Sequence, residues 1–208
     1  MQATDVLAGS TRAGVLSDHI RMRSLVALLP VLGALMVGVF AQVSVPLPFT
    51  PVPLTGQTLA VLLVSAALGP ARGATSLLLY LFGGAAGLPI FAGGASGAAA
   101  VLGPTGGYLI GFVVAAWIVG GLAARGLDRR VGTTLAIYAV GSAVIYLFGA
   151  SWLALVLRIG PREAFDLGVA PFVVGDVLKA LLAAGLLPTA WRVSRRRERE
   201  HVPPRPAV

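Results

Sequence analysis

Long apolar runs, separated by charges, prolines or glycine clusters, fill most of this chain. A helix that crosses the hydrocarbon core of a bilayer needs about 20 mostly apolar residues. Six runs are long enough or nearly so, and we predict a membrane helix in each: 24–43, 55–69, 72–87, 104–124, 132–157 and 170–190. Only residues 69–72 separate the second run from the third, which predicts a tight turn. The pattern therefore predicts an all-α fold, a polytopic membrane protein built as a bundle of six transmembrane helices.

The composition supports a membrane environment and excludes several classes of site. Hydrophobic residues make up 57% of the chain and charged residues 12%, whereas a soluble domain carries roughly 45–50% apolar and about 25% charged residues. The chain has no cysteine, which excludes a disulfide framework, a thiol nucleophile and a Cys-ligated metal. We predict neither a metal nor a cofactor. The net charge of +8 does not indicate nucleic acid, because the arginines lie between the apolar runs.

The positions of the arginines predict how the bundle is oriented. Lys and Arg collect in cytoplasmic loops. Of the 16 basic residues, Arg158 and Arg162 fall on one side of the predicted membrane and Lys179 falls inside the last run, which leaves 13 on the other side. Nine of those 13 flank the two ends of the chain, and four lie in loops between the predicted helices. We therefore expect both termini to be cytoplasmic and the protein to reside in the cell membrane.

The same pattern divides the chain into three parts. Residues 1–23 form a polar cytoplasmic segment, in which Met22 is an alternative start of the chain. Residues 24–190 form the six-helix membrane domain. Residues 191–208 alternate Arg with Glu and end in prolines, which is typical of a disordered, solvated tail. The first run is too long for a signal peptide and lacks a cleavage site, so we expect it to be a retained helix.

Two predicted outer loops carry no charge, although they face water. Residues 44–54 contain four prolines, and residues 88–97 join an apolar stretch to several glycines. Both loops either rest on the bundle at the membrane interface or fold over it as a lid that closes a pocket against water.

Two ionisable groups lie inside the predicted helices, Asp176 and Lys179. Each costs about 2.5–3.5 kcal/mol to insert at the centre of a membrane helix, so each needs an explanation. Their spacing of three residues places them on one helix face. Either they form a buried pair that only neutralises itself, or a ligand separates them, with the carboxylate accepting N–H bonds and the ammonium meeting an anion.

Other polar residues fall at the same depth in the outer half of the bundle. Gln57 and Thr58 open the second predicted helix, and Thr105 and Tyr108 open the fourth. A lone Tyr near an interface is typical of an aromatic anchor. Because three helix ends converge here beneath two apolar loops, we predict a ligand site formed by these residues together with the charged pair.

The sequence lacks residues that two classes of membrane-associated enzyme require. Ser96 lies in a Gly-x-Ser-Gly pattern that intramembrane serine proteases share, but both histidines, His19 and His201, lie outside the predicted helices, so no base reaches the hydroxyl. A phosphate-binding loop needs a Lys directly after Gly, and the single lysine follows Leu178. We therefore predict a transport component that is not an enzyme and that draws energy from a partner or an ion gradient.

Four ordered motifs resemble the BioY family, the biotin-specific substrate-binding (S) components of energy-coupling factor (ECF) transporters. The motifs span residues 46–58, 87–94, 103–112 and 175–179, and the resemblance covers about residues 30–187. It implies six helices, capture of biotin from the outside, and association with a transmembrane coupling protein (T component) and cytoplasmic ABC-type ATPases. The alternatives are a stand-alone vitamin facilitator and an S component for another vitamin.

The resemblance also implies residue roles. Asp176 would receive the ureido N–H groups of biotin, Lys179 would help to hold its valerate carboxylate, and Tyr108 and Gln57 would line the pocket. Some members carry a basic residue in the glycine-rich loop where this sequence has Ala95, so a carboxylate clamp from that loop is not expected.

S components use a small-x-x-x-small face on the first helix to dock the coupling protein. The matching positions here are Ala34 and Gly38, which would allow close approach of the two backbones.

Overall fold

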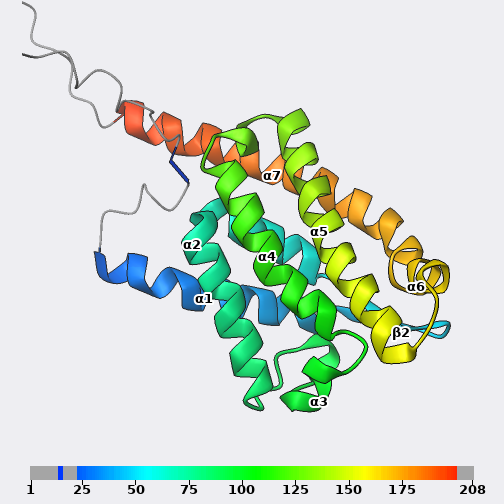
Figure 1. Ribbon diagram of the computed structural model, residues 1–208. Helices are drawn as coiled ribbons and strands as arrows, with labels where there is room; N and C mark the ends of the chain where they lie inside the picture. Colours follow the sequence, from blue (N-terminus) through cyan, green and yellow to red (C-terminus); the bar gives the residue numbers. More distant parts are fainter. Residues whose placement is uncertain (1–13, 16–22, 201–208) are drawn as a thin grey trace, which may run out of the picture.

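The computed structural model describes residues 14–15 and 23–200, and most of these residues form a bundle of long helices (Figure 1). The long helices are α1 (Arg23–Gln42), α2 (Gln57–Ala85), α4 (Gly106–Ala123), α5 (Val131–Leu157) and α7 (Val173–Glu200). Shorter elements join them: β1 (Ser44–Leu47), β2 (Thr50–Thr55), η2 (Ala92–Gly94), α3 (Gly97–Leu102), η3 (Leu127–Arg129), α6 (Pro161–Gly168) and η4 (Ala170–Phe172). Within the described residues, four helices are long and apolar enough to cross a membrane, and Val26–Gln42 is a shorter apolar helix. The predicted helical membrane fold is confirmed.

Helix α2 is two helices folded back on each other, which accounts for the predicted pair 55–69 and 72–87. Gly69 has φ 81° and ψ 180°, a non-helical conformation that breaks the helix, and glycine adopts it without a steric cost. The Gln57 side-chain nitrogen donates to the Tyr80 hydroxyl at 2.7 Å. In a straight helix these two residues would lie about 34 Å apart. The two halves, 57–68 and 70–85, are therefore antiparallel, and the bundle contains all six predicted helices.

Helix α4 packs between α2 and α5 near the centre of the bundle (Figure 1). Close packing requires small residues at its contacts. A Cβ at Gly120 would collide with the backbone of Gly69, at the break of α2, and a Cβ at Gly111 would lie 3.1 Å from the Ile145 Cα of α5. These contacts fix the position of α4 against α2 and α5.

The first outer loop is an ordered β-hairpin, which the sequence analysis did not predict. Strands β1 and β2 pair antiparallel, with Ser44 opposite Thr55. The prolines are tolerated because each strand of a two-stranded sheet has a free edge that needs no N–H donors. The Thr50 hydroxyl donates to the Leu167 carbonyl of α6 at 2.8 Å, which ties the tip of the hairpin to the other side of the bundle.

The second outer loop also rests on the bundle. The Gln42 side-chain nitrogen, at the end of α1, donates to the Phe91 carbonyl at 3.3 Å. The Phe91 ring is buried and meets the Tyr80 ring edge-on, with centroids 5.4 Å apart. Both uncharged loops thus cover the same end of the molecule.

Helix α7 corrects the predicted start of the tail at residue 191, because it continues to Glu200. Trp191 is buried, and its indole nitrogen donates to Asp128 Oδ2 at 2.6 Å. The Arg129 guanidinium carbon lies 4.3 Å from the centroid of the same ring. These contacts hold the helix beyond residue 190, and the Arg and Glu residues that follow are good helix formers. Residues 201–208, with His201, lie outside the described residues.

Only Gly14, Val15 and Arg23 of the predicted N-terminal segment are described, and His19 lies outside them. Val15 is buried, and its side chain lies close to Gly69 at the break of α2. The described ends of α1 and α7 both lie on the left-hand side of Figure 1, at the same end of the bundle.

Candidate functional site

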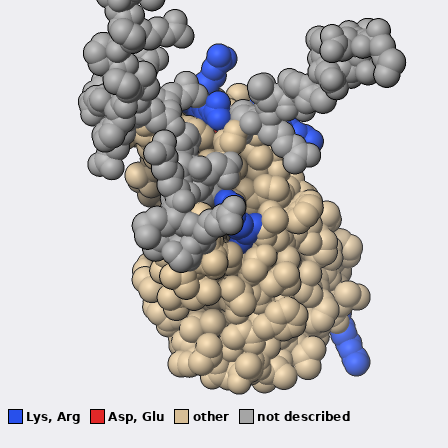
Figure 2. All heavy atoms as spheres, turned by 90° about the vertical axis from the view of Figure 1, so that its left-hand side faces the viewer, with Lys and Arg blue, Asp and Glu red and all other residues tan. Residues whose placement is uncertain are grey.

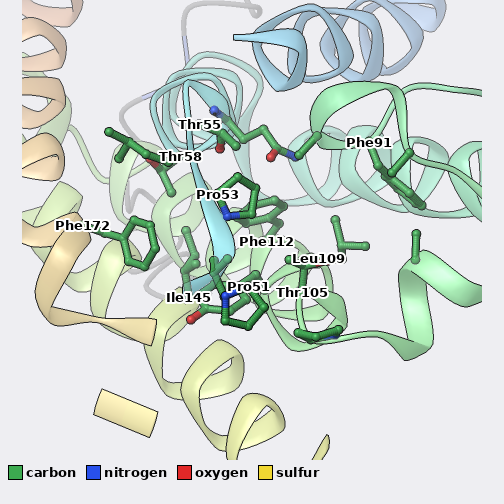
Figure 3. Close-up of a pocket in the computed structure, with 18 of the residues that line it drawn as sticks. Pro51, Pro53, Thr55, Thr58, Phe91, Thr105, Leu109, Phe112, Ile145 and Phe172 are labelled. Atoms are coloured by element: carbon green, nitrogen blue, oxygen red, sulfur yellow. Dashed lines mark hydrogen bonds between the residues drawn. The ribbon is translucent and has the colours of Figure 1, made fainter. Parts of the chain in front are cut away.

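A pocket of about 340 Å³ lies at the end of the bundle that the two loops cover (Figure 3). Its size falls within the range of small-molecule sites, about 300–1,000 Å³. The lining residues come from β2, the two loops, α3, η4, the first turns of α2, α4 and α7, and the middle of α5: Pro51, Val52, Pro53, Leu54, Thr55, Gln57, Thr58, Phe91, Ala92, Ala95, Ala99, Ala100, Gly103, Pro104, Thr105, Tyr108, Leu109, Phe112, Ile145, Tyr146, Phe172, Asp176 and Lys179. All five predicted binding residues, Gln57, Thr105, Tyr108, Asp176 and Lys179, are among them.

The Asp176 carboxylate is the most strongly bonded group of the pocket. It is buried, with 7% of the residue exposed. Its Oδ1 accepts from the Thr58 hydroxyl at 3.1 Å and from the Lys179 ammonium at 3.0 Å. Its Oδ2 accepts from the Tyr146 hydroxyl at 2.7 Å. Three donors from three helices therefore hold both oxygens in place.

Lys179 completes a triangle of polar groups. Its Nζ lies 2.7 Å from the Thr58 Oγ1, in addition to the ion pair with Asp176. Both charged side chains come from one face of α7, as their spacing predicted. The pair brings a neutral but strongly polar corner to a cavity whose remaining walls are mostly apolar, among them Leu109, Ile145 and Phe172 (Figure 3).

Tyr108 and Gln57 line the pocket while their polar ends are bonded to the protein. The Tyr108 hydroxyl donates to the Gly168 carbonyl of α6 at 2.7 Å, so the ring, and not the hydroxyl, faces the cavity. The Gln57 side-chain nitrogen donates a hydrogen bond to the Tyr80 hydroxyl. Thr105 precedes the first residue of α4 and lines the same cavity.

Two members of the polar cluster were missed as binding residues. Thr58 was recognised as a polar residue at the right depth, but its contact with both charges was not predicted. Tyr146 lies in the middle of α5 among apolar residues, where a tyrosine is as easily an ordinary packing residue. A polar hydroxyl deep within a membrane helix was the signal that could have found it.

The BioY family profile matches residues 12–196, which is most of the chain. The chain belongs to the BioY family. The resemblance in its four motifs is thereby confirmed.

Several curated relatives and one solved structure carry BioY or biotin names. The chain is 45% identical over 148 residues to the "Probable biotin transporter BioY" of Pyrococcus horikoshii, covering 71% of this chain and 85% of the relative. It is 40% identical over 147 residues to the "Biotin transporter BioY" of Rhizobium etli, covering 67% and 78%. Its fold is similar to a crystal structure of the S-component for biotin from an ECF-type ABC transporter, with a TM-score of 0.68 and 25% identity over 86% of this chain and 95% of that one.

In this BioY family member the glycine-rich loop contributes Ala95 to the pocket, and Lys179 is the one cation among the residues that line it. Any recognition of an anionic group in the cavity therefore falls to Lys179, hydroxyls and backbone N–H groups.

The structure shows the surroundings of Ala34 and Gly38, the predicted docking pair on α1. Gly38 is buried, and a Cβ there would lie 3.6 Å from the Ile90 Cβ of the second loop. Ala34 is partly buried against the core. Ala34 is thus partly accessible while Gly38 is covered by the second loop, and docking through this pair stays a prediction. The outward face is an apolar stripe at intervals of three and four residues: Leu28, Leu32, Leu35 and Val39, each more than half exposed.

Proposed function

We propose that this chain captures biotin from the outside of the cell membrane and is the substrate-binding component of an ECF-type ABC transporter. The observation that carries the proposal is the Asp176–Lys179 pair, held by Thr58 and Tyr146 in a corner of a mostly apolar pocket. Membership of the BioY family and the names of its relatives support the choice of ligand.

The bonds around Asp176 suggest how the ligand is received. A carboxylate has about four lone-pair sites, and three donors already occupy three of them. A ureido ring brings two N–H donors, so one existing donor must leave. Lys179 is the donor that can leave, because its four-carbon stem is flexible. The freed ammonium then turns toward the carboxylate of the ligand, and Thr58 and Tyr146 keep Asp176 in place.

The apolar walls of the pocket bind the apolar part of the ligand. Rings and methylene groups gain roughly 25 cal/mol for each Å² of apolar surface that they bury, and Phe91, Phe112, Ile145 and Phe172 offer such surface. The loops above the pocket exclude water, which strengthens the charge-assisted bonds at Asp176.

Transport requires an energising partner in this proposal. The sequence has no phosphate-binding loop, so ATP hydrolysis comes from cytoplasmic ABC-type ATPases, coupled through a transmembrane T component. Helix α1 docks that protein through its exposed stripe beside Ala34, while Gly38 lets Ile90 pack closely behind it. Both termini and the arginine-rich loops face the cytoplasm, in keeping with the preference of Lys and Arg for that side.

A ligand-binding scan on the purified full-length chain tests the proposal. Biotin is compared with thiamin and riboflavin by isothermal titration, and uptake of labelled biotin is measured in cells with and without a coupling protein. Binding of biotin alone, with uptake that depends on the coupling protein, is the expected result. Tight binding of another vitamin with biotin ignored would end the biotin assignment, and uptake without any coupling protein would favour the stand-alone facilitator.

A further inference from the structure

A second cavity, of about 490 Å³, lies near the start of α5, beside η3 and the last part of α7, away from the ligand pocket. We call it the basic pocket. Four of its nine lining residues are arginines and none is acidic: Arg125, Gly126, Leu127, Arg129, Arg130, Thr133, Pro188, Trp191 and Arg192. Figure 2 faces the end of the bundle that carries both described termini, and its described part shows blue Lys and Arg atoms but no red Asp or Glu atoms. The charge that lines the basic pocket is thus positive, while the nearby Asp128 carboxylate is buried beside Arg129.

The backbone adds a second feature that attracts anions. Helix α5 begins at Val131 and runs for 27 residues. The first N–H groups of a helix have no intrahelical acceptor, and the helix dipole places partial positive charge at that end. Arg130 and Thr133 flank this turn and line the basic pocket. The Thr133 hydroxyl donates to the Arg130 carbonyl at 3.1 Å, so the guanidinium groups and the free N–H groups of this turn are the donors that a phosphate group would use.

Two neighbouring groups fix the position of the Arg129 guanidinium. Its guanidinium lies over the Trp191 ring, and one terminal nitrogen donates to the Gly14 carbonyl at 3.2 Å. Its Nε is buried and has no hydrogen-bond partner among the described residues. The nearby carboxylate, Asp128, is bonded to Trp191 and does not line the cavity. A buried donor without an acceptor is costly, and an anion in the pocket would supply the acceptor.

We propose that the basic pocket binds a phosphate ester, supplied by the headgroup of an anionic phospholipid. The location favours a lipid over a soluble phosphate, because a 27-residue helix is about 40 Å long and spans the whole bilayer, which puts its first turn at headgroup level. Basic pockets between membrane helices are suited to anionic headgroups. Bound lipid would fix the loop between α4 and α5 against α7.

Thermal unfolding of delipidated full-length protein tests this site. The midpoint is measured with phosphatidylglycerol, with phosphatidylcholine of the same acyl chains, and with inorganic phosphate against chloride at equal ionic strength. The pocket variant combines Arg125→Gln with Arg130→Gln, since both side chains are exposed. The control combines Arg158→Gln with Arg162→Gln, which removes the same charge from exposed positions at the other end of the bundle.

Phosphatidylglycerol should stabilise the native chain more than phosphatidylcholine does. Its apparent affinity should fall about 30-fold in the pocket variant and stay unchanged in the control. Stabilisation by inorganic phosphate alone, lost in the same variant, would support the site and assign a soluble phosphate as its source. Equal responses of both variants would overturn the proposal. A pocket variant that keeps the lipid response but no longer copurifies with the coupling protein would also overturn the proposal. The arginines would then belong to a protein-binding surface.

Discussion

Lys179 Nζ lies 3.0 Å from Asp176 Oδ1, one turn further along α7, and both side chains reach the same corner of the ligand pocket. Each charge thus compensates the other. This arrangement makes a buried acceptor available without leaving an unpaired charge in the membrane, which would be strongly destabilising.

Replacing Asp176 by Ala should weaken biotin binding by roughly 30-fold to several thousand-fold, because truncating one partner of a buried charge pair costs about 2–5 kcal/mol. Asp176→Asn keeps one acceptor and should lose less. Titration of each purified variant, with its melting temperature measured on the same preparation, checks the result. A folded Asp176→Ala protein with normal affinity would show that the pair is only a packing element.

Tyr146→Phe should lower biotin affinity by about 10-fold or more, since it removes one hydrogen bond to a charged group, worth about 1.5–3 kcal/mol. Tyr108→Phe is the matched comparison, because its hydroxyl bonds the Gly168 carbonyl and its ring stays in the pocket. That variant should lose melting temperature and keep most of its affinity. If both variants bind equally well, Tyr146 does not position Asp176 for the ligand.

Bulky residues on the exposed stripe of α1 should uncouple transport from binding. Leu35→Trp combined with Val39→Trp changes side chains that are 57% and 66% exposed, so the fold and biotin affinity should be retained. Uptake and copurification with the coupling protein should be lost. Leu147→Trp combined with Leu155→Trp on α5, at positions 66% and 74% exposed, is the control. Normal uptake by the α1 variant would move the docking face elsewhere.

Stability should depend on pH through Asp128. Burial raises the pKa of this carboxyl above its usual 3.8, although the Trp191 bond and Arg129 oppose the shift. A raised carboxyl pKa favours the folded state most below pH 3.8, and that contribution is lost as pH rises through the folded-state pKa. Asp128→Asn does not titrate, so its melting temperature should improve relative to the native chain as pH rises from 4 to about 7.

Asp166→Asn, at an exposed position of α6, provides the same chemical change without burial. A gap between Asp128→Asn and the native chain that stays constant with pH would contradict the role of the buried carboxyl.

Membrane orientation can be measured directly, because the chain has no native cysteine. Single cysteines at positions 125 and 162 replace exposed arginines at opposite ends of the bundle. An impermeant thiol reagent added to intact cells should label position 162 and spare position 125. The reverse pattern would place both termini outside.

The sequence predicted the parts of the structure that depend on local pattern. The apolar runs defined six helices, and the cost of charge in a membrane drew attention to Asp176 and Lys179. The β-hairpin was missed because four prolines in one loop mask a strand pattern. The length of α7 was missed because it depends on the contact between Trp191 and Asp128, which are 63 residues apart. Tyr146 could be assigned only once α5 was placed against α7.

The shortness of the first half of α2 explains why a cavity exists at all. Residues 57–68 span about 18 Å, whereas the hydrocarbon core is about 30 Å thick. Strand β2 ends just before Gln57, the first residue of this helix, and both β2 and the first turn of the helix line the pocket. A bound ligand would thus occupy space that a full-length helix would otherwise fill. Two or three extra helical turns inserted before Gln57 would then close the binding site.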